Sequence, residues 1–460
     1  LNRKLRPPQI DRIMADTGAP LLVLDGPGLM GLRAELGTDR PMAQAPWHIL
    51  RDGAFSAIHE KTTARLAEDH ALSILDLADP ALPETPGPMA RPDGLPAGCC
   101  LFTSGSTGMP KGVLIAADDL LARADAEIDW FGLSADDVLL SILPFSFDVG
   151  LNQLCSALRV GARLVLLDSW LPADILNAVA EHGVTGISAV PSIWRDMIGA
   201  GMGFDPAGPH ATLRYVTVSG GSLSPRHLRD LRAITPGIGI IKTYGQTEAF
   251  RAACLLPHEI DAHGDSVGRA FGGVRLYVID DDGNPCPPGT GGQVVHTGLG
   301  TMLGYLGGGP EGKRVPNPFH GADDPAEVAI LTGDFGTLDA DGYLTLKGRK
   351  DAMLKVAGNR IYPDEITHEI TNLDAVAEAE LVDVTDADGD TVLAVFVVPR
   401  AGADLTPLAL RRALGGRLPS YMVPQEVVVL DAMPRTASGK PDRPALKADA
   451  QKRLAAGAET

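Results

Sequence analysis

Short apolar runs alternate with helical patterns along the first half of the chain. The runs occupy residues 21–25, 138–143, 163–167, 185–190, 214–219 and 238–243. Helical patterns lie between them at 117–131, 173–182 and 225–234, the last with Ser224 as its expected N-cap and Pro225 as its first residue. This alternation is typical of βαβ units, so we expect a largely parallel sheet with helices on both faces.

After residue 265 the pattern changes to strands separated by turns. We expect strands at 274–280, 293–297 and 343–347, the first two joined by the turn DDGNPCPPGTGG. Past residue 350, helices at 363–372 and 407–414 alternate with strands at 378–384 and 391–398. The fold predicted is therefore α/β, with a large domain of parallel sheets and a β-rich subdomain over 1–348, a hinge at 349–351, and a small α+β domain over 352–460.

Charge and hydropathy exclude several classes of protein. The 460 residues carry 40 basic and 58 acidic side chains, a net charge of −18, which argues against a nucleic-acid groove because an acidic surface repels polyanions. The chain contains no run of about 18 apolar residues and no charged-then-apolar leader, so we expect no membrane insertion and a cytoplasmic location.

The segment Thr103-Ser-Gly-Ser-Thr-Gly-Met-Pro-Lys111 has the composition of a phosphate-binding loop. Its glycines let the backbone approach an anion, its hydroxyls donate hydrogen bonds, and Lys111 supplies positive charge. It is not a Walker A loop, because only two residues separate Gly105 from Gly108. A serine- and glycine-rich surface turn is the alternative interpretation.

Three further segments carry groups suited to a nucleotide. Tyr244-Gly-Gln-Thr-Glu248 follows the run at 238–243, where the end of a parallel strand favours ligand binding. Asp334 suits paired ribose hydroxyls, and Arg349 suits ribose or phosphate. Near the C-terminus, a turn-forming stretch at 434–443 presents Lys440. Taken alone, each segment has a simpler interpretation. The first is a polar strand end, the second is an acidic turn with a solvated basic patch, and the third is a turn with a solvated lysine.

Together, in this order, the four segments resemble the adenylate-forming (ANL) superfamily of acyl-CoA synthetases, peptide-synthetase adenylation domains and luciferases. The resemblance covers essentially the whole chain and implies an ATP-dependent ligase that forms an acyl-adenylate and then a thioester. Family members usually carry more residues before the stretch resembling residues 1–25, so the first subdomain is expected to be truncated at its N-terminus.

The resemblance implies a role for each matching residue. Lys111 and the loop residues would cover the ATP phosphates, Lys440 would bridge the substrate carboxylate and the α-phosphate, and Asp351 would be the hinge of a mobile small domain. The expected nucleotide-binding positions are Thr103, Ser104, Gly105, Ser106, Thr107 and Gly108 on the phosphates, Gly220, Gly221 and Tyr244 around the adenine, Thr247 on the α-phosphate, Glu248 on Mg²⁺, and Asp334 with Arg349 on the ribose.

The segment 143–153 matches the family position that begins the acyl pocket, with Phe147, Asp148 and Gln153 as pocket residues. In amino-acid-activating members an Asp at the place of Asp148 pairs with the substrate's amino group, but Asp148 could equally cap the following helix. This segment, together with Thr247-Glu-Ala-Phe-Arg251, most resembles free-standing AMP-forming acyl-CoA ligases of the exosortase-associated type. The acid therefore stays open between an acyl and an amino acid, and the acceptor between coenzyme A and the phosphopantetheine arm of a carrier protein.

Overall fold

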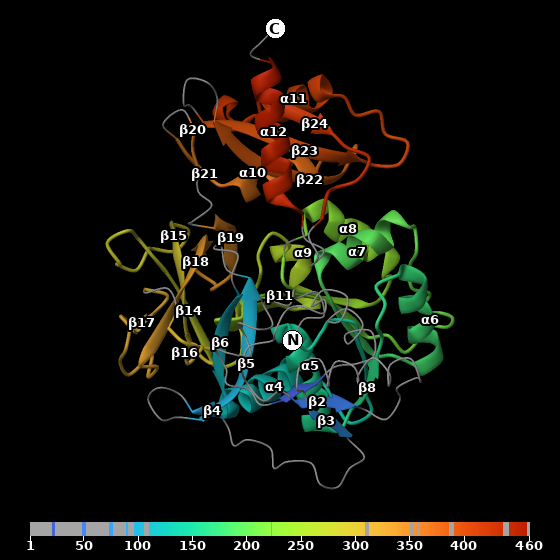
Figure 1. Cartoon of the computed structure of the whole chain (residues 1–460), viewed down its shortest axis with the longest axis vertical. Helices are drawn as coiled ribbons and strands as arrows, with labels where there is room; N and C mark the ends of the chain where they lie inside the picture. Colours follow the sequence, from blue (N-terminus) through green and yellow to red (C-terminus); the bar gives the residue numbers. More distant parts are fainter. Residues whose placement is uncertain are drawn as a thin grey trace. The chain divides into compact units, whose positions relative to one another are not determined.

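The computed structural model describes residues 21–23, 48–51, 73–76, 89–90, 96–104, 110–221, 223–308, 312–349, 354–356, 359–385, 391–435 and 441–457 (Figure 1). The chain forms two compact units. One comprises Leu1–Asp118 with Met302–Glu311, and the other comprises Asp119–Thr301 with Gly312–Thr460. No helix within the described ranges is both long and apolar enough to cross a membrane.

The first unit contains two small sheets. A parallel sheet consists of β1 (Leu21–Val23), β2 (His48–Arg51) and β3 (Ser73–Asp76). An antiparallel sheet has the order β16-β6-β5-β4, with β4 at Met89–Ala90, β5 at Pro96–Ser104, β6 at Pro110–Ala116 and β16 at Gly304–Tyr305. The hairpin of β5 and β6 brackets the predicted phosphate loop.

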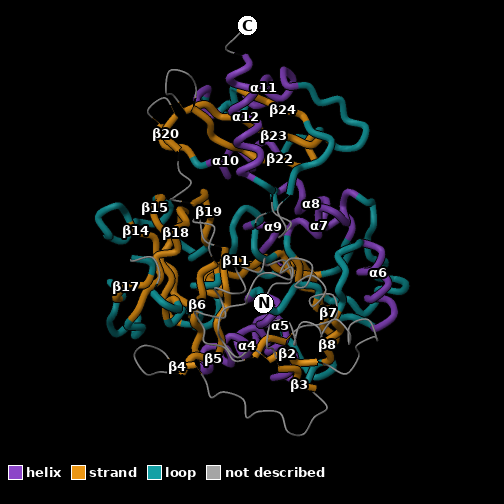
Figure 2. Tube along the Cα trace, viewed as in Figure 1, coloured by secondary structure: helices purple, strands orange, loops and turns teal. Residues whose placement is uncertain are grey.

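A seven-stranded sheet lies in the second unit, in the order β13-β12-β11-β10-β9-β7-β8. Figure 2 labels its strands β7, β8 and β11. Its strands are β7 (Val138–Ser141), β8 (Arg163–Leu166), β9 (Gly186–Ala189), β10 (Tyr215–Val218), β11 (Gly239–Gln246), β12 (Ala249–Leu255) and β13 (Arg269–Ala270). The five strands from β8 to β11 pair in parallel, whereas β12 and β13 are antiparallel. The parallel sheet predicted from the alternating runs is thus confirmed, and two antiparallel strands extend it.

Helices cover both faces of this sheet, because successive strand residues point to opposite sides and both sides are apolar. In β11, Ile240 packs into one hydrophobic cluster and Ile241 into another. The first cluster includes buried residues of α6 (Pro172–His182), α7 (Pro191–Gly199) and α8 (Pro225–Ile234). The second includes residues of α4 (Ala117–Phe131) and α5 (Asp148–Val160).

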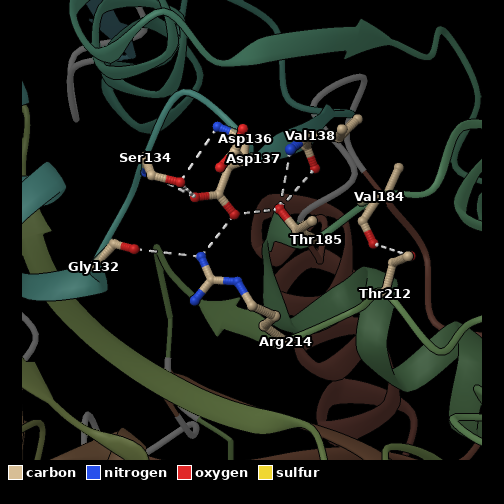
Figure 3. A network of polar contacts seen from close by, with 9 residues as sticks. All are labelled: Gly132, Ser134, Asp136, Asp137, Val138, Val184, Thr185, Thr212 and Arg214. Atoms are coloured by element: carbon tan, nitrogen blue, oxygen red, sulfur yellow. Dashed lines mark hydrogen bonds and ion pairs between the residues drawn. The ribbon is translucent and has the colours of Figure 1, made fainter.

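A polar network joins the starts of three parallel strands at the edge where they begin (Figure 3). The carboxylate of Asp137, which precedes β7, accepts hydrogen bonds from Ser134, from the Thr185 hydroxyl at 2.6 Å and from Arg214 at 2.7 Å. Burial alone would raise the pKa of Asp137, but these hydrogen bonds and the charge of Arg214 outweigh it and lower that pKa. The network stabilises the sheet at the edge opposite to the strand ends where ligands bind.

The β-rich segment and the small α+β domain also follow the predicted pattern. The first has the strand order β14-β15-β18-β17, with β19 paired to β18. Its strands are β14 (Val274–Ile279), β15 (Gly291–Gly298), β17 (Arg314–Pro316), β18 (Val328–Leu338) and β19 (Leu344–Arg349). Beyond it lie β20 (Leu354–Val356), β21 (Asn359–Ile361), α10 (Pro363–Thr371), β22 (Val376–Thr385), β23 (Thr391–Pro399), α11 (Pro407–Gly415), β24 (Glu426–Val429) and α12 (Arg443–Gly457).

Candidate active site

The carboxyl ends of β10 and β11 bring the predicted adenine-binding residues to one edge of the central sheet. The two strands pair in parallel with Val218 opposite Lys242. Just beyond that pair, the hydroxyls of Ser219 and Thr243 form a hydrogen bond of 2.8 Å. Gly220 and Tyr244 directly follow these two residues, so the strand ends hold both at the same level.

Gly220 has a φ of 74°, a left-handed conformation that a side chain with a Cβ adopts only with strain. Gly220 and Gly221 are both exposed. A turn of this kind gives a flat ligand access to the backbone at the strand end, which is compatible with the predicted adenine position.

Tyr244, Asp334 and Arg349 form one hydrogen-bonded group, although 105 positions separate the first from the last in the numbering. The Tyr244 hydroxyl donates to one carboxylate oxygen of Asp334, and the Arg349 Nη1 donates to the other at 3.3 Å. Asp334 and Arg349 face each other across β18 and β19. The structure therefore brings together three of the five residues that the resemblance assigns to adenine and ribose.

Burial raises the pKa of the Asp334 carboxyl, and the Tyr244 hydrogen bond and the charges of Arg349 and Lys313 only partly oppose this rise. Burial also raises the pKa of the Tyr244 phenol, and the Asp334 carboxylate raises it further. The phenol therefore stays a donor, and the desolvated carboxylate gains from any additional donors, such as a pair of ribose hydroxyls.

Two residues beside this group were not predicted as site residues from the sequence. Gln246 donates from its Nε2 to the Thr332 carbonyl at 3.1 Å and accepts from the Lys313 Nζ at 2.6 Å. Lys313 also donates to the Thr332 carbonyl at 2.9 Å. Gln246 lies inside the motif that contains Tyr244 and Glu248, so its place in the sequence could have identified it as a site residue. Lys313 lies in no such motif.

Thr247 and Glu248 form the turn between β11 and β12, between the paired residues Gln246 and Ala249. Both are half-buried. The negative charge of Glu248 raises the pKa of Asp148, so the two carboxyls lie within electrostatic range of each other. The predicted metal ligand and the predicted pocket residue thus belong to one region.

Asp148 is the first residue of α5 but not its N-cap, which is Phe147 and makes no side-chain cap. Its Oδ1 accepts from the backbone N–H of Val149 at 2.8 Å. Burial raises the pKa of Asp148, against the lowering effects of that hydrogen bond and of the Arg123 and Arg251 charges. Asp148 is thus not the N-cap residue, but its carboxylate accepts from one of the free backbone N–H groups in the first turn of α5. Both a role at the helix end and a role in the substrate pocket stay open.

The other two predicted pocket residues differ in exposure. Phe147 is 39% exposed. Gln153 is buried, and its Nε2 donates to the Leu140 carbonyl at 3.3 Å, which fastens α5 to β7. Its amide oxygen has no hydrogen-bond partner among the described residues. The role of both residues in substrate binding stays a prediction.

Several expected site residues fall outside the described ranges. Thr103 and Lys111 face each other across the hairpin of β5 and β6, which Ser104 and Pro110 terminate. The stretch between these two strands, which contains Gly105, Ser106, Thr107 and Gly108, lies outside the described residues. Asp351 and Lys440 also lie outside them, each in a different part of the chain. Their roles, and the boundary at 349–351, stay predictions.

Comparison with known families gives two matches. A family model described as AMP-binding enzyme matches residues 1–306. A second, described as AMP-binding enzyme C-terminal domain, matches residues 365–440.

Among curated relatives, the indoleacetate–CoA ligase of Aromatoleum aromaticum is 32% identical over 347 residues, which cover 74% of this chain and 64% of the ligase. The dimodular nonribosomal peptide synthase of Bacillus subtilis is 31% identical over 361 residues, which cover 76% of this chain and 15% of the synthase. The chain thus spans less than two thirds of each.

Among solved structures, the o-succinylbenzoate CoA synthetase of Bacillus subtilis in complex with its acyl-adenylate intermediate has a TM-score of 0.72 at 23% identity. That match covers 97% of this chain and 82% of the synthetase. An anthranilate CoA ligase in complex with anthranoyl-AMP has a TM-score of 0.76 at 22% identity, covering 99% and 83% of the two chains. Both share the fold of a large N-terminal and a small C-terminal domain.

Proposed function

Because this chain belongs to the AMP-binding enzyme family, we propose that it is an AMP-forming acid–thiol ligase. It would activate a carboxylic acid with ATP to an acyl-adenylate and pyrophosphate, and then transfer the acyl group to the pantetheine thiol of coenzyme A. The observation that carries the proposal is the half-buried Asp334 carboxylate. It accepts from Arg349 and from Tyr244, and Tyr244 belongs to β11, the strand that leads into the Thr247–Glu248 turn.

The nucleotide would lie at the carboxyl edge of β10 and β11. Gly220, Gly221 and the ring of Tyr244 would flank the adenine, which needs flat surfaces with little side-chain bulk. Asp334 would accept hydrogen bonds from the ribose hydroxyls, with the Arg349 guanidinium beside it.

The first step joins two anions, because a carboxylate oxygen attacks the α-phosphorus while the bond to the pyrophosphate oxygen breaks. The barrier comes mainly from repulsion and charge build-up. Cationic and hydroxyl side chains that are placed around the phosphates would lower it by stabilising the negative charge and by aligning the reacting groups. Thr247 would contact the α-phosphate, Lys440 would bridge that phosphate and the substrate carboxylate, and the loop from Thr103 to Lys111 would cover the leaving pyrophosphate.

Glu248 fits a magnesium ion by the chemistry of its donor. Mg²⁺ prefers oxygen ligands and is commonly held by one or two carboxylates together with substrate phosphates. When bound, it would neutralise charge on the phosphate oxygens. Glu248, half-buried in its turn, would hold it from the protein side.

In the second step the thiolate sulfur attacks the acyl carbonyl, the thioester bond forms, and AMP leaves. Withdrawal of Lys440 by rotation of the small domain about Asp351 would clear the face that the thiol approaches, so one site would run two reactions.

A second candidate is an amino-acid adenylation enzyme that loads the phosphopantetheine arm of a carrier protein. Asp148 favours it, because this half-buried carboxyl within electrostatic range of Glu248 would gain from a substrate ammonium group as a partner. However, the positive charges of Arg123 and Arg251 already stabilise the Asp148 carboxylate, so it has less need of a substrate cation. We therefore prefer the acyl-CoA ligase.

The experiment that tests the function is acid-dependent ATP–pyrophosphate exchange over fatty, aryl and amino acids, followed by thioester formation with coenzyme A and with carrier proteins. We expect exchange with at least one acid and thioester formation with coenzyme A. Transfer only to a carrier protein would establish the second candidate. ATP binding without exchange for any acid would overturn both and indicate a nucleotide-binding protein without ligase activity.

We predict that Asp148→Ala abolishes exchange with amino acids and spares simple fatty or aryl acids, because only an ammonium group needs the carboxylate. Asp174→Ala is the matched control, since Asp174 is also an acidic residue in the first turn of its helix, α6. If both substrate classes respond alike to the two variants, Asp148 acts on the structure and not on substrate choice.

A further inference from the structure

Arg251 has a backbone conformation that sets it apart from the rest of the described chain. Its φ is 40°, and it is the one non-glycine residue in the described ranges with a positive φ. For an L residue with a bulky side chain this conformation is strained, and such strain persists only where the surrounding structure holds it. Arg251 lies three residues after Glu248, so the strain is close to the predicted metal ligand.

The strain belongs to a β-bulge in the hairpin of β11 and β12. Tyr244 pairs with Ala253 and Gln246 pairs with Ala249, so Gly245 alone faces the three residues from Phe250 to Ala252. A Cβ at Gly245 would lie 2.4 Å from the Arg251 nitrogen, which shows how closely the two strands approach here. A bulge bends the strand that carries it, so the conformation of Arg251 sets the direction in which the Thr247–Glu248 turn leaves the sheet.

One ion pair and three aromatic rings hold the Arg251 side chain. Its Nη2 lies 3.2 Å from the Glu127 carboxylate of α4, and the two side chains are 2% and 1% exposed. Glu127 also accepts a hydrogen bond from Asn152 of α5. The guanidinium carbon lies 5.0, 5.3 and 5.5 Å from the ring centres of Phe131, Phe250 and Phe271.

Such an ion pair is costly to bury, because both ions lose their hydration, so it is weak evidence for a stabilising role by itself. Because the ion pair of Arg251 and Glu127 lies at the bulge, it also fixes the conformation of the hairpin. The pair and the three rings hold the one strained non-glycine residue of the described chain in the hairpin whose turn presents Thr247 and Glu248.

We propose that Arg251 is a positioning residue: anchored by Glu127, it holds the bulge that aims the Thr247–Glu248 turn at the metal and phosphates of the bound nucleotide. This inference rests on the proposed function, because it assumes that Glu248 ligates the nucleotide's Mg²⁺.

The test compares Arg251→Met with Arg159→Met in the full chain. Arg159 of α5 also pairs with an acidic residue of α4, Asp125, but both side chains are about half exposed. ATP binding is titrated by calorimetry over a range of Mg²⁺ concentrations, and thermal unfolding is recorded for each variant. We expect Arg251→Met to raise the half-saturating Mg²⁺ concentration by about tenfold to a hundredfold, the range usual for residues that orient a metal ligand. Arg159→Met should leave it unchanged.

A lowered melting temperature with an unchanged Mg²⁺ requirement would overturn the proposal, since a purely structural role predicts that result. If Arg251→Met does not fold, Arg251→Lys and Glu127→Gln replace it, and each should raise the Mg²⁺ requirement by a smaller factor. If the unaltered chain binds Mg²⁺ and ATP but exchanges with no acid, the ligase proposal fails while this titration still decides the role of Arg251. If the unaltered chain binds no nucleotide, both proposals fail.

Discussion

At the scale of single residues, Asp148 and Asp334 are carboxyl groups whose folded environment disfavours their charge. Burial raises the pKa of each above its ordinary value. Between the unfolded and folded pKa values the folded chain binds more protons, so these two groups reduce stability as pH rises through that window. A ligand that donates hydrogen bonds or brings a cation relieves this cost, which is the expected behaviour of binding groups.

We predict that Asp334→Asn raises the KM for ATP by about tenfold to a hundredfold, because hydrogen bonds to a charged group are worth about 1.5–3 kcal/mol. The KM for the acid should stay unchanged. Steady-state exchange assays with each substrate varied in turn provide the measurement.

Asp324 supplies the matched control for that variant. It is a buried carboxylate in the same β-rich segment, and it also accepts from a tyrosine, with the Tyr277 hydroxyl at 3.0 Å. Asp324→Asn should lower stability and leave the KM for ATP alone. An equal rise in both variants would mean that Asp334 acts only by holding the segment together.

The sequence predicted the chemically distinctive site residues better than the ones that support them. Tyr244, Asp334 and Arg349 stand in recognisable motifs, and the structure joins them in one group. Lys313 and Arg251 escaped prediction because a lysine or arginine without a recognised role is usually solvated. Only the pairing of distant strands and helices reveals that Arg251 meets Glu127.

At the scale of elements, α8 follows the rules that predicted it. Ser224 is its N-cap, with the side chain accepting from the His227 N–H, and Pro225 is its first residue. The same Ser224 hydroxyl lies 3.0 Å from the His227 Nδ1, and the Nε2 lies 3.2 Å from the Ala377 carbonyl. Because a carbonyl only accepts, Nε2 carries a proton. The Ser224 hydroxyl is able to donate to the Nδ1 of a neutral imidazole.

Burial and, to a smaller extent, the charges of Arg195 and Arg400 lower the pKa of His227 from 6.5 to about 4, against the opposing effect of Asp230. The unfolded chain therefore takes up a proton below pH 6.5 that the folded chain resists. The stability that His227 contributes is complete above that pH and is lost as pH falls towards 4, by at most about 3 kcal/mol.

We predict that His227→Gln flattens the fall in unfolding free energy between pH 6.5 and pH 4, as measured by urea unfolding at a series of pH values. The exposed His258→Gln should keep the slope of the unaltered chain. Buried His296 also has its pKa lowered to about 4, but its contribution is common to all three chains and cancels. Equal slopes in the two variants would contradict this account of His227.

Element types were easier to predict than their directions. The run that becomes β12 is apolar apart from Arg251 and fully buried, so nothing in its pattern separates a parallel from an antiparallel strand. The turn before it, Thr247-Glu248, lacks the Asn-Gly or Gly-rich signal of a tight hairpin. The phosphate and metal roles that we propose for these two residues would account for that departure.

At the scale of the whole molecule, the second unit contains charged contacts between α7 or α8 and the segments around β22. Arg226 of α8 donates to the Leu373 carbonyl, and the Arg195 Nε lies 3.6 Å from Glu378 of β22. A rotation of the small domain would have to break these contacts. Local patterns in a sequence do not predict these contacts or the free energy needed to break them, because the surfaces involved meet only in the folded chain.

We predict that Lys440→Ala abolishes carboxylate-dependent exchange, by at least about a hundredfold, while thioester formation from a supplied acyl-adenylate continues. The reason is charge: adenylation brings two anions together and needs the lysine, whereas the thiol attacks an acyl carbonyl whose leaving group, AMP, is already in place. Exchange and single-turnover transfer from purified adenylate measure the two steps separately.

Lys447→Ala is the control for that experiment, because Lys447 lies near in sequence but pairs with Asp383 at the surface. It should leave both steps unchanged. Equal loss of both steps in Lys440→Ala would show that the lysine serves the whole site or the stability of the small domain. In that case the proposal that the small domain takes a different position for each reaction loses its main support. If both steps need Lys440, a rotation that withdraws it after adenylation would hinder thioester formation.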